Sequence, residues 1–178
     1  MSEILLVLTG TDHLTLTDGS EHPTGFWAEE FTAPYRAFIE AGHRVAVATP
    51  GGVVPTVDPV SLTPEVNGGP AGAAAIAAAV EAAAELRAPL TLADVDPGRY
   101  AAVFYVGGHG PLQDLARDTD SARLLRAVHT AGTPLAVVCH GVAALLATED
   151  ADGPSPGGRG PAPRGESAGG RARPPGAA

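Results

Sequence analysis

The residues best suited to chemistry are Cys139 and His140, which stand between an apolar run and a helix-forming segment. Residues 135–138 are typical of a buried strand, and Gly141 precedes the helix-forming residues 142–146. A strand, a sharp turn and a helix with a thiol at the turn form the layout of a nucleophile elbow. Because the turn exposes the side chain and the first N–H groups of the helix favour a thiolate, Cys139 is a candidate nucleophile.

A buried structural role is the alternative for Cys139, since free cysteine often behaves as a small apolar side chain. Two other segments favour the catalytic interpretation. The turn Gly107-Gly108-His109-Gly110 follows an apolar run, and Glu29 and Glu30 lie in a helical pattern. Because ligands bind beyond the carboxyl ends of parallel strands, we expect these segments to meet beside Cys139.

Each segment has a catalytic interpretation and a purely structural one. Gly107 and Gly108 would let backbone N–H groups approach a reacting oxygen, as an oxyanion hole requires, or would form only a turn. A carboxylate near the thiol would move protons, and burial would raise its pKa into a useful range. Glu29 and Glu30 are separated by about 100° on a helix, so only one of them can face the site. The structural alternative is that Glu29 and Glu30 are a solvent-exposed pair in the first turn of the helix.

Composition excludes several classes of protein. The chain has 178 residues, of which 44% are hydrophobic and 17% charged, which fits one globular domain. The net charge of −9 argues against nucleic-acid binding, and one cysteine fits a reducing compartment. We find no signal peptide and no membrane span, and therefore predict a cytoplasmic protein. The chain has no phosphate-binding loop, dinucleotide fingerprint or zinc-type cluster, so we expect no cofactor and no metal.

Short apolar runs alternate with helical patterns along the first 150 residues. We predict strands at residues 4–8, 44–48, 100–106 and 133–138, and helices at residues 25–41, 71–86 and 120–131. Residues 11–23 are expected to be loop, and Pro34 is expected to kink or split the first helix. Continuous apolar strands between helices predict an α/β fold with a parallel sheet covered on both faces.

The composition changes after residue 150. Residues 151–178 hold eight Gly, six Pro, six Ala and four Arg, and no Ile, Leu, Val, Phe, Tyr or Trp. Such a segment cannot bury enough apolar surface to offset its ordering entropy, so we predict a disordered tail beside a domain at 1–150. A natural tail is one interpretation. A GC-rich gene read out of frame is the one we favour, because the α/β pattern stops after its last helix.

Several motifs in order resemble the ThiJ/PfpI superfamily, whose class I glutamine amidotransferase-like fold is of flavodoxin type. They are Thr24-Gly25 with Glu30 and Pro34, Pro50-Gly51-Gly52, Pro55-x-x-Asp58-x-x-Ser61, Gly107-Gly108-His109-Gly110 with Asp114-Leu115, and the run that ends at Cys139-His140-Gly141. The Gly-Gly-His-Gly signature and the long segment at 50–80 look most like the heat-shock chaperone and glyoxalase III branch.

The resemblance implies a set of roles. Cys139 would be the nucleophile, Glu30 the proton-shuttling carboxylate and His140 the imidazole. Gly107, Gly108 and His109 would line the oxyanion hole and substrate pocket, with the His140 N–H as second donor. The implied activity is cofactor-free conversion of methylglyoxal to lactate, or a related deglycase reaction. Small aldehydes or glycated groups would be the substrates, and a homodimer the assembly.

The chain also departs from this family pattern. Relatives continue with further strands and an acidic residue that orients the histidine, whereas here residues 151–178 follow, so we expect a flavodoxin-like sheet that is incomplete at its C-terminus. Two other functions therefore stay open beside the glyoxalase. One is a non-catalytic or truncated relative that acts as a holdase chaperone. The other is a cysteine peptidase or amidotransferase-like hydrolase.

Overall fold

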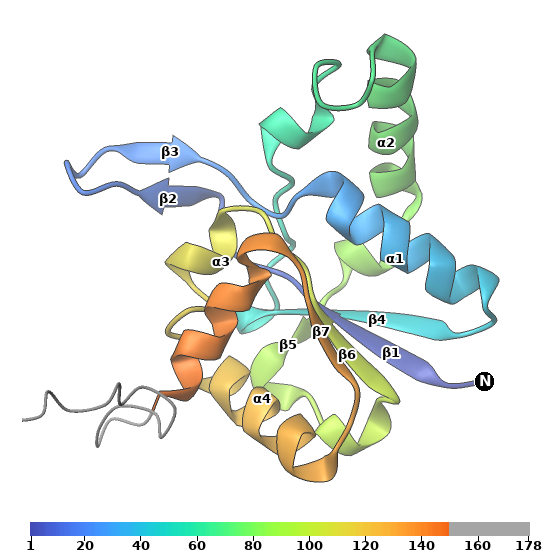
Figure 1. Cartoon of the computed structure of the whole chain (residues 1–178), viewed down its shortest axis with the longest axis vertical. Coiled ribbons are helices and arrows are strands. Elements are labelled where there is room, and N and C mark those ends of the chain that lie inside the picture. Colours follow the sequence, from blue (N-terminus) through green and yellow to red (C-terminus); the bar gives the residue numbers. More distant parts are fainter. Residues whose placement is uncertain (150–178) are drawn as a thin grey trace, which may run out of the picture. The chain divides into compact units, whose positions relative to one another are not determined.

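A parallel five-stranded sheet forms the centre of the computed structural model, which describes residues 1–149 (Figure 1). The strands are β1 (Glu3–Val7), β4 (Arg44–Thr49), β5 (Leu90–Thr91), β6 (Ala102–Tyr105) and β7 (Leu135–Val137), in the order β5-β4-β1-β6-β7. All four strand pairs are parallel. The four longer strands follow the order 2-1-3-4 of flavodoxin-like folds, which confirms the predicted fold class.

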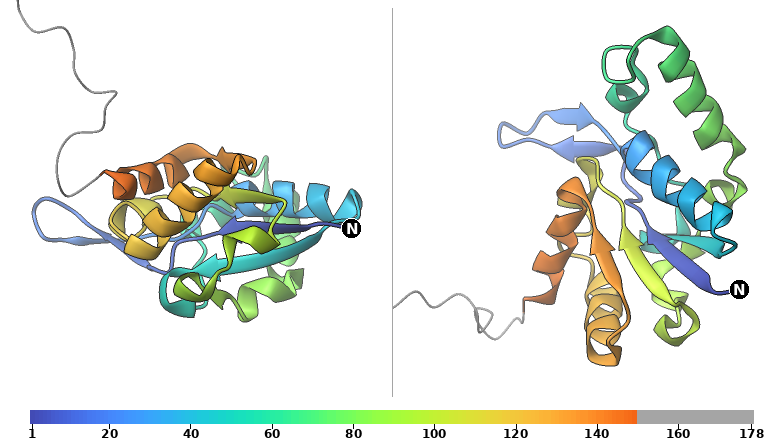
Figure 2. Two further views of the ribbon diagram at one scale, coloured as in Figure 1. Left: turned by 90° about the horizontal axis from the view of Figure 1, so that it is seen from below. Right: turned by 45° about the vertical axis from the view of Figure 1, so that its right-hand side comes forward.

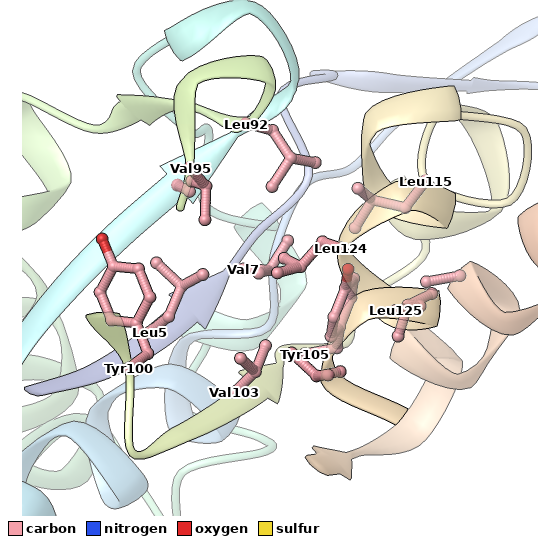
Figure 3. Packing of buried hydrophobic residues seen from close by; sticks show 13 residues of the cluster. Leu5, Val7, Leu92, Val95, Tyr100, Val103, Tyr105, Leu115, Leu124 and Leu125 are labelled. Carbon is pink, nitrogen blue, oxygen red and sulfur yellow. The ribbon is translucent and has the colours of Figure 1, made fainter. Parts of the chain in front are cut away.

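The central strand β1 is buried on both faces of the sheet, as the continuous apolar runs predicted, whereas the edge strand β7, predicted to be buried, has Leu135 and Ala136 exposed. Leu5 and Val7 of β1 belong to one hydrophobic cluster and Leu6 to another, because alternate side chains point to opposite faces. The first cluster includes residues of α4 (Thr119–Ala131) and is drawn in Figure 3. The second includes Phe31 of α1 (Ala28–Glu40). The helices therefore cover the sheet from both sides.

The remaining helices are short or stand apart from the sheet. Helix α2 (Pro70–Ala82) has no buried residue and packs on α1, beyond which it stands in Figures 1 and 2. Helix α3 (Gly110–Gln113) follows β6. The 3₁₀ helices are η1 (Pro50–Gly52), η2 (Pro59–Leu62), η3 (Ala84–Arg87), η4 (Leu92–Asp94), η5 (Pro97–Arg99) and η6 (Cys139–Thr148). Helices α4 and η6 lie side by side (Figure 2).

Several predicted boundaries were wrong. The expected loop at 11–23 contains an antiparallel hairpin of β2 (His13–Thr15) and β3 (Glu21–Pro23). Helix α1 begins at Ala28 because the backbone of Phe26 pairs with the chain at Thr56 and Asp58, with N···O distances of 2.9 and 2.8 Å. Pro34 lies inside α1 without splitting it. The segment after Cys139 is a 3₁₀ helix.

Residues Met1–Thr148 form one compact unit. The predicted tail at 151–178, its disorder and its frameshift origin fall outside the described residues. The incompleteness of the sheet at the C-terminus depends on the same segment and stays a prediction.

Candidate active site

The candidate site lies at the carboxyl ends of three neighbouring strands. Strands β1, β6 and β7 are adjacent in the sheet, and the chain leaves β6 toward Gly107 and β7 toward Cys139. Helix α1 is attached to this edge because the N–H of Trp27 donates to the carbonyl of Gly107 at 3.1 Å. The carboxyl edge beside a change in strand direction is where open α/β sheets bind ligands.

Cys139 stands at a strained turn between β7 and η6. Its φ is +50°, and it is the one non-glycine residue with a positive φ among residues 1–149. Such a conformation costs energy, and it is common where structure holds a reactive side chain in place. The thiol is exposed, and its Sγ lies 3.3 Å from Nδ1 of His140. The predicted elbow and the Cys139–His140 pair are therefore both present.

Glu30 is the glutamate that faces this turn, whereas Glu29 is exposed. Its Oε2 is buried and has no hydrogen-bond partner in the described part of the chain. A Cβ placed on Gly107 would collide with Glu30 Oε2 and would lie 2.7 Å from the Cβ of Cys139. The missing side chain of Gly107 is therefore what lets the carboxylate approach the thiol.

Burial has the largest effect on the pKa of the Glu30 carboxyl. It raises the pKa of the carboxyl, although contacts with Cys139, the backbone N–H of Gly107 and the charge of His140 each act to lower that pKa. A carboxyl group with a raised pKa releases and takes up protons more readily near neutral pH than an ordinary glutamate.

The backbone conformation and the close neighbours of Gly108 leave no room for a side chain at this position. Its φ is +97°, and a Cβ there would lie 2.8 Å from the N of Trp27 and would collide with the carbonyl of Gly25. The glycine turn therefore lies against the start of α1. The N–H groups of Cys139 and His140 open η6, where backbone donors have no acceptor within the helix. Backbone donors thus lie close to the thiol on the helix side.

The His109 ring lies beside two other histidine rings, one of which belongs to His140. Its ring centroid lies 4.9 Å from that of His140 and 6.3 Å from that of His22. Its Nδ1 lies 4.0 Å from Oδ2 of Asp58, a carboxylate that is 2% exposed. Reasoning from the residues assigned no role to Asp58. The Asp58-Pro59 pair at the start of η2 is a helix-start signal, which marks its local structure but not its neighbour His109.

A groove lies apart from these site residues. It has a volume of about 650 Å³, runs between α1 and α2 and is lined by residues such as Tyr35, Ile39 and Ile76. Cys139, Glu30 and His140 do not line it. The candidate site therefore lies outside this groove.

Residues 1–149 lack two features that other classes of protein have. No group of three or more His, Cys, Asp or Glu side chains in that part of the chain is arranged to hold a metal ion. None of its helices combines the length and apolar character needed to cross a bilayer.

Known proteins are similar to this chain in sequence and in fold. The model of the DJ-1/PfpI family matches residues 23–156. The protein/nucleic acid deglycase HchA of Pseudomonas aeruginosa is 32% identical over 152 residues, which are 82% of this chain and 50% of that protein. Glyoxalase 3 of Candida albicans is 27% identical over 143 residues, which are 80% of this chain and 59% of that protein. This chain thus spans about half the length of the HchA relative.

Solved structures agree with the sequence comparison. The crystal structure of glyoxalase III from Candida albicans matches with a TM-score of 0.68 and 26% identity, covering 87% of this chain and 64% of the other. Rapid Encystment Protein 24 kDa of Francisella tularensis has the same TM-score at 25% identity, covering 86% and 65%. Because the family model matches well over half of the chain, this protein belongs to the DJ-1/PfpI family.

Proposed function

We propose that the protein is a cysteine-dependent enzyme that converts methylglyoxal to lactate without an external thiol. The observation that carries this proposal is that Glu30, whose Oε2 is buried, and Cys139 both border the space left by the missing side chain of Gly107. The reaction needs a nucleophile and a group that moves a proton, and these two side chains match those needs. The similarity to glyoxalase 3 and to the deglycase HchA supports the same class of substrate.

The first step forms a covalent adduct. The Cys139 thiolate attacks the aldehyde carbon of methylglyoxal, and the aldehyde oxygen takes a proton to give a hemithioacetal. Backbone N–H groups of Gly108 and His140 would stabilise the oxyanion as it develops. The strained backbone at Cys139 holds the sulfur in the exposed position that this attack requires.

The second step moves hydrogen between two carbons. Glu30 removes the proton from the former aldehyde carbon, which gives an enediolate, and returns it to the neighbouring carbon, while the hydroxyl proton passes from the first oxygen to the second. The first carbon is thereby oxidised to a thioester and the second is reduced to an alcohol, so no outside oxidant is needed. Water then hydrolyses the thioester, releasing lactate and the Cys139 thiol. A deglycase reaction would use the same nucleophile on an adduct of the same aldehyde.

The test measures loss of methylglyoxal and gain of lactate in the absence of glutathione. Wild-type protein should form lactate, and Cys139→Ala should form none. Glu29→Gln is the matched control, because Glu29 adjoins Glu30 but is exposed, and this variant should retain wild-type activity. Lactate formation that persists in Cys139→Ala would end the assignment.

The same variants separate the other candidate functions. Suppression of client aggregation that is equal in wild type and Cys139→Ala, without lactate formation, would identify a holdase. Casein cleavage that disappears in Cys139→Ala would identify a peptidase.

A further inference from the structure

Asp58 is a buried carboxylate beside the site, and the proposed reaction does not use it. Its side chain is 2% exposed. Oδ2 accepts a hydrogen bond from the hydroxyl of Thr24 at 2.6 Å, and Oδ1 accepts one from the N–H of Val60 at 2.9 Å. Both donors are neutral, and a buried charge is costly unless an opposite charge compensates it. Among residues 1–149, the basic side chain within ion-pair distance of Asp58 is His109, whose Nδ1 lies 4.0 Å from Oδ2.

Contacts continue from His109 to the thiol. The rings of His109 and His140 lie 4.9 Å apart and are inclined by 48°. Nδ1 of His140 then lies 3.3 Å from Sγ of Cys139. The position of the His109 ring therefore limits where the His140 imidazole lies beside the sulfur.

The backbone just before α1 holds the segments that carry Asp58 and His109 in place. The N–H of Asp58 donates to the carbonyl of Phe26 at 2.8 Å, and the N–H of Gly110 donates to the carbonyl of Gly25 at 3.3 Å. The segments that carry the acid and the imidazole are thus attached to neighbouring residues at the start of α1. The separation of Asp58 from His109 is therefore set by backbone hydrogen bonds.

We infer that Asp58 is a positioning residue that acts through His109. Its carboxylate holds the His109 ring in place, and that ring in turn holds the His140 imidazole beside the Cys139 sulfur. The inference rests on the proposed role of Cys139 as nucleophile. The titratable groups facing His109 are Asp58 from the start of η2, His22 from β3 and His140 from η6. Glu30 faces Cys139 from α1.

Alkylation of Cys139 by iodoacetamide tests this without any aldehyde substrate. Cys139 is the sole cysteine of the chain, so the label reports on one sulfur. Asp58→Asn keeps an oxygen that can accept from Val60 but removes the charge. Alkylation near neutral pH should slow roughly three- to tenfold and its pH profile should change, because the imidazole beside the sulfur is no longer held in place. The side chain of His109 is 42% exposed, and solvent screening keeps the effect in this modest range.

Asp96→Asn is the matched control. Asp96 caps η5 as Asp58 caps η2, by accepting from a backbone N–H two residues later, and a proline follows each acid. It precedes β6 and so lies at the opposite end of this strand from the site. Alkylation in Asp96→Asn should follow the wild-type pH profile.

His109→Gln distinguishes this role from a structural one. This variant alters a half-exposed side chain, so the fold should persist, and it should slow alkylation as Asp58→Asn does. Adding Asp58→Asn to His109→Gln should cause no further slowing, because the intermediary is gone. A second, additive loss would overturn the inference. Faster alkylation in Asp58→Asn would also overturn it, because direct repulsion between Asp58 and the thiolate would then dominate. These outcomes stand whether or not the protein consumes methylglyoxal.

Discussion

Two acidic side chains at the carboxyl edge of the sheet, Glu30 and Asp114, differ in how their charge is accommodated. Burial raises the pKa of both. Asp114 nevertheless accepts hydrogen bonds from the Thr9 hydroxyl at 2.8 Å, the Gly10 N–H at 2.7 Å and the Leu115 N–H at 2.6 Å. Glu30 Oε2 has no partner among the described residues.

The difference separates a structural carboxylate from one that is available for chemistry. The Asp114 carboxylate links the segment after β1 to the backbone N–H of Leu115, so both of its oxygens already accept hydrogen bonds. Glu30 keeps a buried oxygen that points toward the gap between Gly107 and Cys139. A buried polar atom without a partner is costly, and such atoms in native proteins often belong to functional sites. We therefore expect Glu30 to govern activity and Asp114 to govern stability.

The largest effect is expected for Glu30→Gln. Glutamine keeps the size of the side chain but cannot move a proton, so lactate formation should fall by about 10²- to 10⁴-fold. The free energy of unfolding at neutral pH should stay the same or rise, since no hydrogen bond is lost and a buried charge is removed. Activity assays and urea unfolding measure the two quantities. A variant with full activity would remove Glu30 from the mechanism.

Asp114→Ala should show the opposite pattern. Three donors would lose their acceptor, so the free energy of unfolding should fall by about 2–4 kcal/mol. Urea unfolding at neutral pH measures the loss, and Asp114→Asn, which keeps one acceptor oxygen, should lose less. If Asp114→Ala were as stable as wild type, the hydrogen bonds would not contribute as proposed.

The pH dependence of stability should also report on Glu30. Burial raises the pKa of Glu30 above its ordinary value of 4.5, so the folded state holds this proton when the unfolded chain has released it. The resulting stabilisation is fully present below pH 4.5 and is lost as the pH rises through the folded pKa. Glu30→Gln should therefore gain stability relative to wild type between pH 4.5 and neutrality. A relative loss over that interval would contradict the raised pKa.

The smallest effect is expected for Thr9→Val. This change removes one of the three donors to Asp114 while keeping the shape of the side chain. The free energy of unfolding should fall by about 1 kcal/mol, and lactate formation should stay within twofold of wild type. Thermal unfolding is the measurement. A large loss of activity would mean that the segment after β1 contributes directly to the site.

Local patterns predicted the elements that have strong apolar runs. All four predicted strands are present, with ends that differ by one or two residues. Strand β5 was missed because two residues form no pattern. The hairpin β2–β3 was missed because part of what holds it is distant in sequence. The N–H of Thr15 donates to Oε1 of Gln113 at 3.1 Å.

The sequence by itself determined the parallel sheet, the elbow at Cys139 and the glycine turn at Gly107 and Gly108, because apolar runs and turn residues act on neighbouring backbone. Only the tertiary structure decided that Glu30 buries its Oε2 while Glu29 is exposed, that Asp114 has hydrogen-bond donors, and that Asp58 lies beside His109. The physical reason is that burial and ion-pair distances depend on residues far apart in the chain. The bond from Trp27 to Gly107 sets the position of Glu30, and no local pattern encodes it.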